Sequence, residues 1–154
     1  MDINRYIDYT NLKAVATKED IKKLCDEAIK YGFASVCVNP CYVELAHDLL
    51  DGTNVSVCTV VGFPLGANKV ATKEFEAIAA IEDGADEIDM VINIGALKDK
   101  DYDYVKEEIE TVRDSIGGKV LKVIVETCYL TNEELKKATE ICNETFVNFI
   151  KTST

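Results

Sequence analysis

The stretch Val120-Leu121-Lys122-Val123-Ile124-Val125 is apolar at every position but one. A strand with one buried and one exposed face alternates apolar and polar residues, and this stretch does not. Runs rich in Val and Ile are typical of parallel strands that are buried on both faces. Five further runs are predicted as strands on the same grounds: Ile7–Thr10, Ser35–Val38, Val55–Val61, Glu87–Ile92 and Phe146–Lys151.

Segments with helical periodicity separate these runs. Two of them open with a capping-box signal, Thr17 followed by Asp20 and Thr131 followed by Glu134, in which the threonine hydroxyl accepts from an unpaired backbone N–H. Gly32 follows the first of these helices, as a left-handed terminating residue requires. The predicted helices are Lys18–Tyr31, Tyr42–Leu50, Lys73–Asp83, Tyr102–Ile116 and Asn132–Cys142.

Six strands that alternate with five helices predict an α/β fold with right-handed crossovers. Two architectures fit this pattern, a doubly wound open sheet and part of a (β/α)8 barrel. The last predicted strand leads directly into Lys151-Thr152-Ser153-Thr154, with no helix to cover it. We therefore expect residues 1–154 to form one domain that is unfinished at its C-terminal end, and the pattern alone leaves both architectures open.

Composition and charge exclude several classes of function. The chain has 154 residues, with 17 Lys and Arg against 28 Asp and Glu, which gives a formal net charge of −11. An acidic chain is a poor partner for nucleic acid, because phosphate binding needs a basic face. No apolar run approaches the roughly 20 residues of a membrane span, and Met1-Asp2-Ile3-Asn4-Arg5 does not resemble a signal peptide. We expect a cytoplasmic protein without a membrane or nucleic-acid partner.

The cysteines and the single histidine do not suggest a metal site. Zinc sites use tight Cys and His clusters, and the six cysteines contain no CxxC pair. We expect no metal, and reduced cysteines that are mostly buried. The only histidine, His47, has polar neighbours on a predicted helix and is expected to be exposed rather than catalytic. The cysteines are Cys25, Cys37, Cys41, Cys58, Cys128 and Cys142.

Three charged residues lie inside predicted buried strands: Asp89, Lys122 and Lys151. An unpaired buried charge costs several kcal/mol, so these side chains are expected to converge and pair. Two lysines and a carboxylate suit carbonyl chemistry, because a nearby ammonium and a low dielectric lower the pKa of a lysine amine that must be neutral to attack. A purely structural ion pair, or a lysine that reaches into solvent, remains the alternative.

Four segments resemble the deoxyribose-phosphate aldolase family, in order along the whole chain. The resemblance implies a (β/α)8 TIM barrel, of which about six βα units are present, and a class I aldolase that needs no metal or cofactor. Such an enzyme reversibly cleaves 2-deoxy-D-ribose 5-phosphate into D-glyceraldehyde 3-phosphate and acetaldehyde. The segments are Ala34-Ser35-Val36-Cys37-Val38-Asn39-Pro40, Val61-Gly62-Phe63-Pro64-Leu65-Gly66, Gly84-Ala85-Asp86-Glu87-Ile88-Asp89-Met90-Val91-Ile92-Asn93 and Phe149-Ile150-Lys151-Thr152-Ser153-Thr154.

The same resemblance implies roles for particular residues. Lys151 matches the lysine that forms the Schiff base with acetaldehyde, and Asp89 matches the carboxylate that exchanges a proton at the acetaldehyde carbon. Lys122 matches a second lysine on a strand beside the site. The positions that match substrate-lining residues are Asp8, Thr10, Cys37 and Thr154.

The chain departs from the family in length and at one helix end. Family members continue through two further strands, which carry another lysine and the loops that hold the substrate phosphate. We therefore expect open sheet edges that pair with another copy, and weak or absent activity. A catalytically silent fragment that acts as a binding or assembly module is the alternative function. Phe146 stands where the family has glycine, so Asn143 is expected to adopt the helix-ending conformation.

Overall fold

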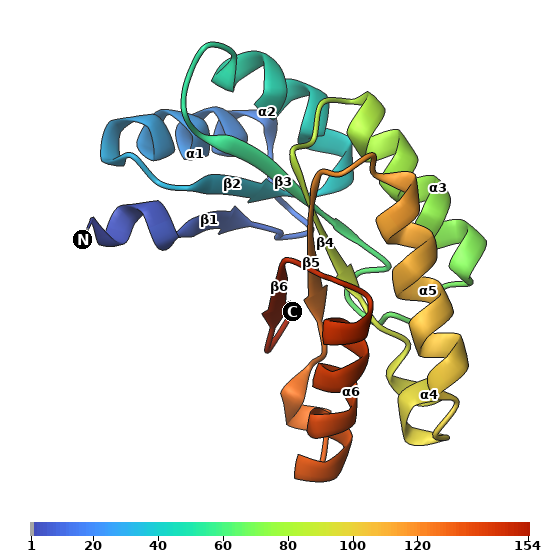
Figure 1. The fold of residues 1–154 in the computed structure, drawn as a ribbon. Coiled ribbons are helices and arrows are strands. Elements are labelled where there is room, and N and C mark those ends of the chain that lie inside the picture. Colours follow the sequence, from blue (N-terminus) through green and yellow to red (C-terminus); the bar gives the residue numbers. More distant parts are fainter. Residues whose placement is uncertain (1) are drawn as a thin grey trace. The chain divides into compact units, whose positions relative to one another are not determined.

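A computed structural model describes residues 2–154, whose contacts fall into two compact units. The first unit holds residues 2–60 and Ala80–Glu87, and the second holds Val61–Ala79 and Ile88–Thr154. Six strands follow one another in chain order within the sheet, β1-β2-β3-β4-β5-β6. Figure 1 shows how helices alternate with these strands along the chain, which confirms the α/β class predicted from the sequence. The single domain expected over 1–154 stays a prediction.

The first unit pairs its strands in parallel. Ser35 lies opposite Asp8 on one side and opposite Ser56 on the other. The predicted capping box of Thr17 and Asp20 is present at the start of α1, and Gly32 ends this helix with a φ of 68°. Its elements are β1 (Asp8–Asn11), α1 (Lys18–Tyr31), β2 (Ser35–Val38), α2 (Val43–Leu50) and β3 (Ser56–Val61), with short 3-10 helices at Ile3–Tyr6 and Pro40–Tyr42.

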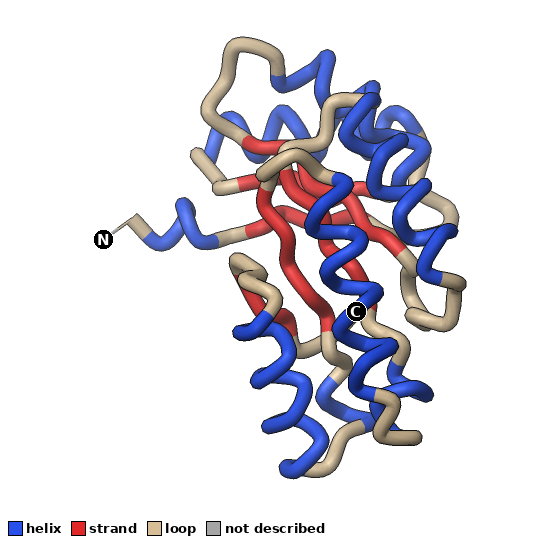
Figure 2. The backbone as a smooth tube through the Cα atoms, turned by 45° about the vertical axis from the view of Figure 1, so that its right-hand side comes forward, coloured by secondary structure: helices blue, strands red, loops and turns tan. Residues whose placement is uncertain are grey.

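The second unit carries the other three strands. β5 and β6 pair in parallel, and helices α4, α5 and α6 pack against one another (Figure 2). The predicted capping box of Thr131 and Glu134 opens α6. The remaining elements are α3 (Val70–Glu82), β4 (Glu87–Val91), α4 (Ile94–Lys98), α5 (Tyr102–Ser115), β5 (Val120–Ile124), α6 (Asn132–Glu144) and β6 (Phe149–Lys151), with a 3-10 helix at Thr127–Tyr129.

The helix ending before β6 differs from the prediction. Asn143 stays inside α6, so the expectation that it adopts the terminating conformation is wrong. Phe146 itself takes the left-handed backbone, with a φ of 55°, although it is no glycine. Arg113 supports this turn, because its Nη2 donates to the carbonyl oxygen of Phe146 at 2.7 Å and to Asn148 Oδ1 at 3.1 Å. The Phe146 ring is 85% exposed, so burial of the ring contributes little to offset the backbone cost.

Most of the cysteines are buried, as expected from the sequence. No disulfide joins any of the six cysteines within residues 2–154, and Cys25, Cys37, Cys58 and Cys142 are buried. Burial raises the pKa of the Cys25 thiol to about 11 and that of the Cys142 thiol to about 12, which makes both poor nucleophiles at neutral pH. Over residues 2–154, the helices are too short or too polar for any of them to cross a membrane.

Phe146→Gly should stabilise the chain by about 1 kcal/mol, because glycine adopts a positive φ without the steric cost that a Cβ brings. The measurement is the midpoint of urea unfolding. Phe75→Gly is the matched control: Phe75 is also an exposed aromatic residue, but it lies inside helix α3, where glycine lowers stability. A Phe146→Gly chain that loses as much stability as the control would contradict the backbone argument.

Candidate active site

The three charged residues predicted to converge do meet in the second unit. Asp89 lies on β4, Lys122 on β5 and Lys151 on β6. Lys151 Nζ donates a hydrogen bond to Asp89 Oδ2, and Lys122 Nζ lies 3.3 Å from Asp89 Oδ1. One carboxylate is therefore bracketed by two ammonium groups from consecutive strands.

Strand register explains why both lysines reach the same carboxylate. Lys151 lies opposite Ile124 in the parallel pairing of β5 with β6. Ile124 is two residues beyond Lys122, and side chains two residues apart on a strand point to the same face. Lys122 and Lys151 therefore project from the same face of the sheet, and Lys151 lies level with the residue two positions beyond Lys122.

Burial distinguishes the three side chains. The Asp89 side chain is 1% exposed and that of Lys122 is 7% exposed, whereas that of Lys151 is 29% exposed. A buried carboxylate is costly unless cations compensate it, and here two do. Lys151 is thus the member of the cluster whose side chain pairs with the buried carboxylate and is also partly exposed to solvent.

A fourth polar residue lies directly after β5. Glu126 is 6% exposed and accepts hydrogen bonds from Ser153 Oγ at 2.9 Å and from Thr154 Oγ1 at 2.5 Å. The hydrogen bond from the Thr154 hydroxyl is the main cause that lowers the pKa of the Glu126 carboxyl. Thr154, predicted to line the substrate pocket, is therefore held in place by Glu126. Glu126 was not predicted as a site residue. Its only mark in the sequence is that a charged residue follows directly after a buried strand.

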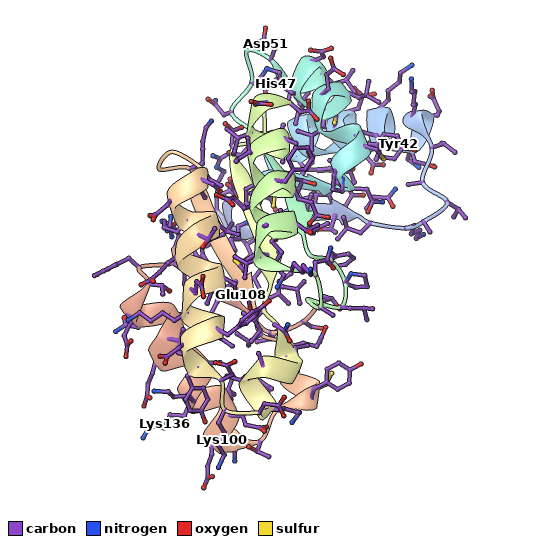
Figure 3. All side chains as sticks on the ribbon, turned by 90° about the vertical axis from the view of Figure 1, so that its right-hand side faces the viewer. Tyr42, His47, Asp51, Lys100, Glu108 and Lys136 are labelled. Atoms are coloured by element: carbon purple, nitrogen blue, oxygen red, sulfur yellow. The ribbon has the colours of Figure 1, made fainter. Side chains whose placement is uncertain are left out.

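A buried ion pair that was not predicted from the sequence supports the carboxyl end of β4. Lys73 of α3 and Glu108 of α5 have fully buried side chains, with Lys73 Nζ 2.5 Å from Glu108 Oε2; Figure 3 labels Glu108 on its helix. Lys73 Nζ also donates to the carbonyl oxygen of Val91 at 2.8 Å, and the Asn93 N–H donates to Glu108 Oε1 at 2.6 Å. Burial lowers the pKa of Lys73 and raises that of Glu108. The pair fixes the backbone just beyond Asp89.

The turn after β3 packs closely against the backbone that follows β4. Gly66 has a φ of 67°, and a Cβ at this position would lie 1.9 Å from the carbonyl oxygen of Ile92. The Gly62 N–H donates to Glu76 Oε2 at 2.7 Å. Only glycine fits at position 66, because any side chain would collide with the backbone that follows β4. The close approach supports a packing role for this turn.

Three predicted substrate-lining residues lie in the first unit. Asp8 and Thr10 are on β1 and Cys37 is on β2. Asp8 Oδ1 accepts from Ser35 Oγ at 2.8 Å, and Thr10 Oγ1 donates to the carbonyl oxygen of Asp8 at 2.9 Å. Their substrate-lining role stays a prediction. His47 is exposed on α2, as its polar neighbours indicated (Figure 3).

The fold and the cluster together define a class of protein. Consecutive parallel strands carry a lysine that reaches solvent, a buried carboxylate and a second, buried lysine, which suits the chemistry of carbonyl compounds through a lysine imine. Residues 5–154 match the family described as DeoC/LacD family aldolase. The chain belongs to this family.

Relatives of the chain agree with this assignment. A deoxyribose-phosphate aldolase from Finegoldia magna is 64% identical over 154 residues, which are 100% of this chain and 72% of the relative. The solved structure of QR15, an aldolase, has a TM-score of 0.95 at 45% identity and is matched over 100% of this chain and 69% of its own. The tetrameric deoxyribose phosphate aldolase from Aeropyrum pernix has a TM-score of 0.88 at 30% identity, over 98% and 64% of the two chains.

The chain thus spans about two thirds of the length of these relatives. The predicted fold class, the (β/α)8 barrel family with six βα units present, is confirmed by the strand order and by these structures.

Lys73→Met should lower the free energy of unfolding by about 3–5 kcal/mol, because it leaves Glu108 charged, buried and without its cation. Adding Glu108→Gln should restore much of this loss, since the amide is neutral and its oxygen still accepts from the Asn93 N–H. Urea unfolding of the wild type, both single variants and the double variant measures the coupling.

Lys106→Met is the control, because Lys106 pairs with Glu144 at 3.1 Å on the surface. We expect a far smaller loss there, since exposed ion pairs contribute little. Equal losses in Lys73→Met and Lys106→Met would contradict the importance of the buried pair.

Proposed function

We propose that the chain carries the catalytic lysine site of a deoxyribose-phosphate aldolase. The reaction is the reversible cleavage of 2-deoxy-D-ribose 5-phosphate into D-glyceraldehyde 3-phosphate and acetaldehyde, through a Schiff base on Lys151. The observation that carries this proposal is the hydrogen bond from the solvent-reaching Lys151 amine to the buried Asp89 carboxylate, with Lys122 on the other carboxylate oxygen. The 64% identity to the deoxyribose-phosphate aldolase of Finegoldia magna supports it.

In the cleavage direction, the neutral amine of Lys151 attacks the substrate aldehyde carbon and water leaves, which forms a protonated imine. The protonated imine draws the electron pair of the C2–C3 bond as that bond breaks, which forms an enamine. The hydroxyl on C3 gives its proton to water and becomes the aldehyde group of D-glyceraldehyde 3-phosphate, which leaves. The resulting enamine takes a proton at its terminal carbon, and water then hydrolyses the imine to release acetaldehyde. Each step is reversible, which allows aldol addition as well.

The two partners of Lys151 have different roles in this scheme. Asp89 accepts and returns the proton at the acetaldehyde carbon, through a water molecule. Lys122, as a buried ammonium, disfavours a second positive charge nearby and so favours the neutral amine that Lys151 needs for attack. The lysine itself supplies the electron sink, so the proposal assigns no metal or cofactor.

The proposal has three further parts, which concern the substrates, the location and the assembly of the chain. The substrates are small sugar phosphates and aldehydes, and the enzyme acts in the cytoplasm. We also infer that copies of the chain associate: Phe149 and Ile150 on β6 are 59% and 39% exposed, and the Aeropyrum pernix relative is tetrameric.

Trapping with acetaldehyde and borohydride tests the nucleophile. Reduction of the imine leaves an ethyl group on the reacting lysine, and we expect peptide mapping to find it on Lys151 well before Lys122. Lys151→Arg should abolish the adduct at this position while keeping the positive charge. Lys136→Arg is the control, because Lys136 is an exposed lysine of α6 and its loss should leave the Lys151 adduct unchanged.

Labelling in proportion to lysine exposure, without enrichment at Lys151, would overturn the aldolase proposal. A catalytically silent binding or assembly module would then be the better reading of the chain.

A further inference from the structure

We propose that Glu126 is a positioning residue, whose carboxylate holds the segment after Lys151 and thereby fixes where the Lys151 amine lies against Asp89. This inference rests on the proposed function and extends it to a residue outside the cluster of Asp89, Lys122 and Lys151. Three observations support it: the left-handed backbone of Glu126, the hydrogen bonds of its side chain, and the backbone hydrogen bonds of the residues on either side of it.

The backbone of Glu126 is unusual for its residue type. Its φ of 51° and ψ of 69° lie in the left-handed region, which is costly for a residue with a Cβ. Strained positions of this kind persist only where the surroundings hold them, and they cluster at functional sites. The conformation turns the chain sharply at the end of β5 and leaves the Glu126 side chain 6% exposed.

The carboxylate of Glu126 binds the last two residues described. Oε1 accepts from Ser153 Oγ at 2.9 Å and from Cys128 Sγ at 3.6 Å. Oε2 accepts from the Thr154 N–H at 3.0 Å and from Thr154 Oγ1 at 2.5 Å. Hydrogen bonds to an ionised acceptor are about twice as strong as neutral ones. Because both oxygens already accept two hydrogen bonds each, this carboxylate is suited to holding the segment rather than to transferring protons.

The backbone on both sides of Glu126 grips the same segment. The Val125 N–H donates to the carbonyl oxygen of Lys151 at 3.0 Å, and the Thr127 N–H donates to that of Thr152 at 2.7 Å. The backbone thus anchors residues 151 and 152, and the Glu126 side chain anchors residues 153 and 154. Four consecutive residues, beginning with Lys151, are fixed to one turn.

This anchoring matters because lysine has a long, flexible side chain. Asp89 holds the amine at the end of the Lys151 side chain, but the backbone sets the direction in which the aliphatic part of that side chain starts. If residues 152–154 move, the aliphatic part moves and the amine spends less time in reach of both Asp89 and the bound aldehyde. Misplacement of a reacting group by about 1 Å can cost up to a hundredfold in rate.

Glu126→Gln tests the inference, because it removes the charge and one pair of acceptors while keeping the size of the side chain. We expect borohydride trapping at Lys151 to slow about tenfold, the usual effect of losing hydrogen bonds to a charged group. Hydrogen exchange at the Thr154 amide should accelerate by a similar factor, since that N–H donates directly to Glu126. Urea unfolding shows whether the variant is folded.

Matched variants separate this role from a general loss of stability. Glu107→Gln removes the same charge from an exposed position on α5 and should change neither readout. Ser153→Ala removes one of the hydroxyl groups that donate to Glu126 and should slow trapping in the same direction as Glu126→Gln, but by less.

The outcomes distinguish this inference from the function on which it rests. If the wild-type chain forms the Lys151 adduct and folded Glu126→Gln forms it equally fast, the positioning role is overturned and the proposed function stands. If the wild-type chain shows no enrichment at Lys151, the proposed function fails and this inference fails with it. Slower trapping together with faster Thr154 exchange in folded Glu126→Gln, with neither change in Glu107→Gln, supports the positioning role.

Discussion

A buried carboxylate between two lysines is the interaction on which this site depends. Asp89 is almost wholly removed from solvent, and its charge is tolerable only because Lys122 and Lys151 face it from the next two strands. That requirement fixes which residues of β5 and β6 must share a face, and the observed register meets it. The same arrangement places the amine of the partly exposed Lys151 beside a proton acceptor. The geometry that compensates the buried charge of Asp89 is therefore also the geometry that the proposed chemistry needs.

Two further carboxylates hold this geometry from outside the cluster. Glu108, paired with Lys73, fixes the backbone that follows Asp89 through hydrogen bonds that involve Val91 and Asn93. Glu126 fixes the residues that follow Lys151. Each of the two thus secures the chain just after one member of the reacting pair, so that neither Asp89 nor Lys151 depends on its own side-chain contacts alone.

The sequence predicted the first five strands and the charged cluster well, because both leave a local mark. The sixth strand is shorter than predicted, Phe149–Lys151 instead of Phe146–Lys151, and it is not buried. Uninterrupted apolar runs mark the buried strands, and a charge inside such a run, as at Lys122, is conspicuous. Lys73 and Glu108 left no such mark, since both lie on amphipathic helices where charged residues are normally exposed. The five-residue helix α4 was too short for periodicity to show it. The prediction for Asn143 was wrong because Arg113, distant in sequence, supports a left-handed backbone at Phe146.

Exchange of the methyl hydrogens of acetaldehyde would test most directly whether Asp89 and Lys151 act as one unit. Deuterated acetaldehyde, incubated with the chain in ordinary water, should lose methyl deuterium through repeated formation of the enamine. The account predicts that Asp89→Asn greatly slows this exchange while borohydride still traps the imine on Lys151, because the nucleophile remains and the proton carrier is gone. Exchange at the wild-type rate in Asp89→Asn, with the imine still formed, would contradict it.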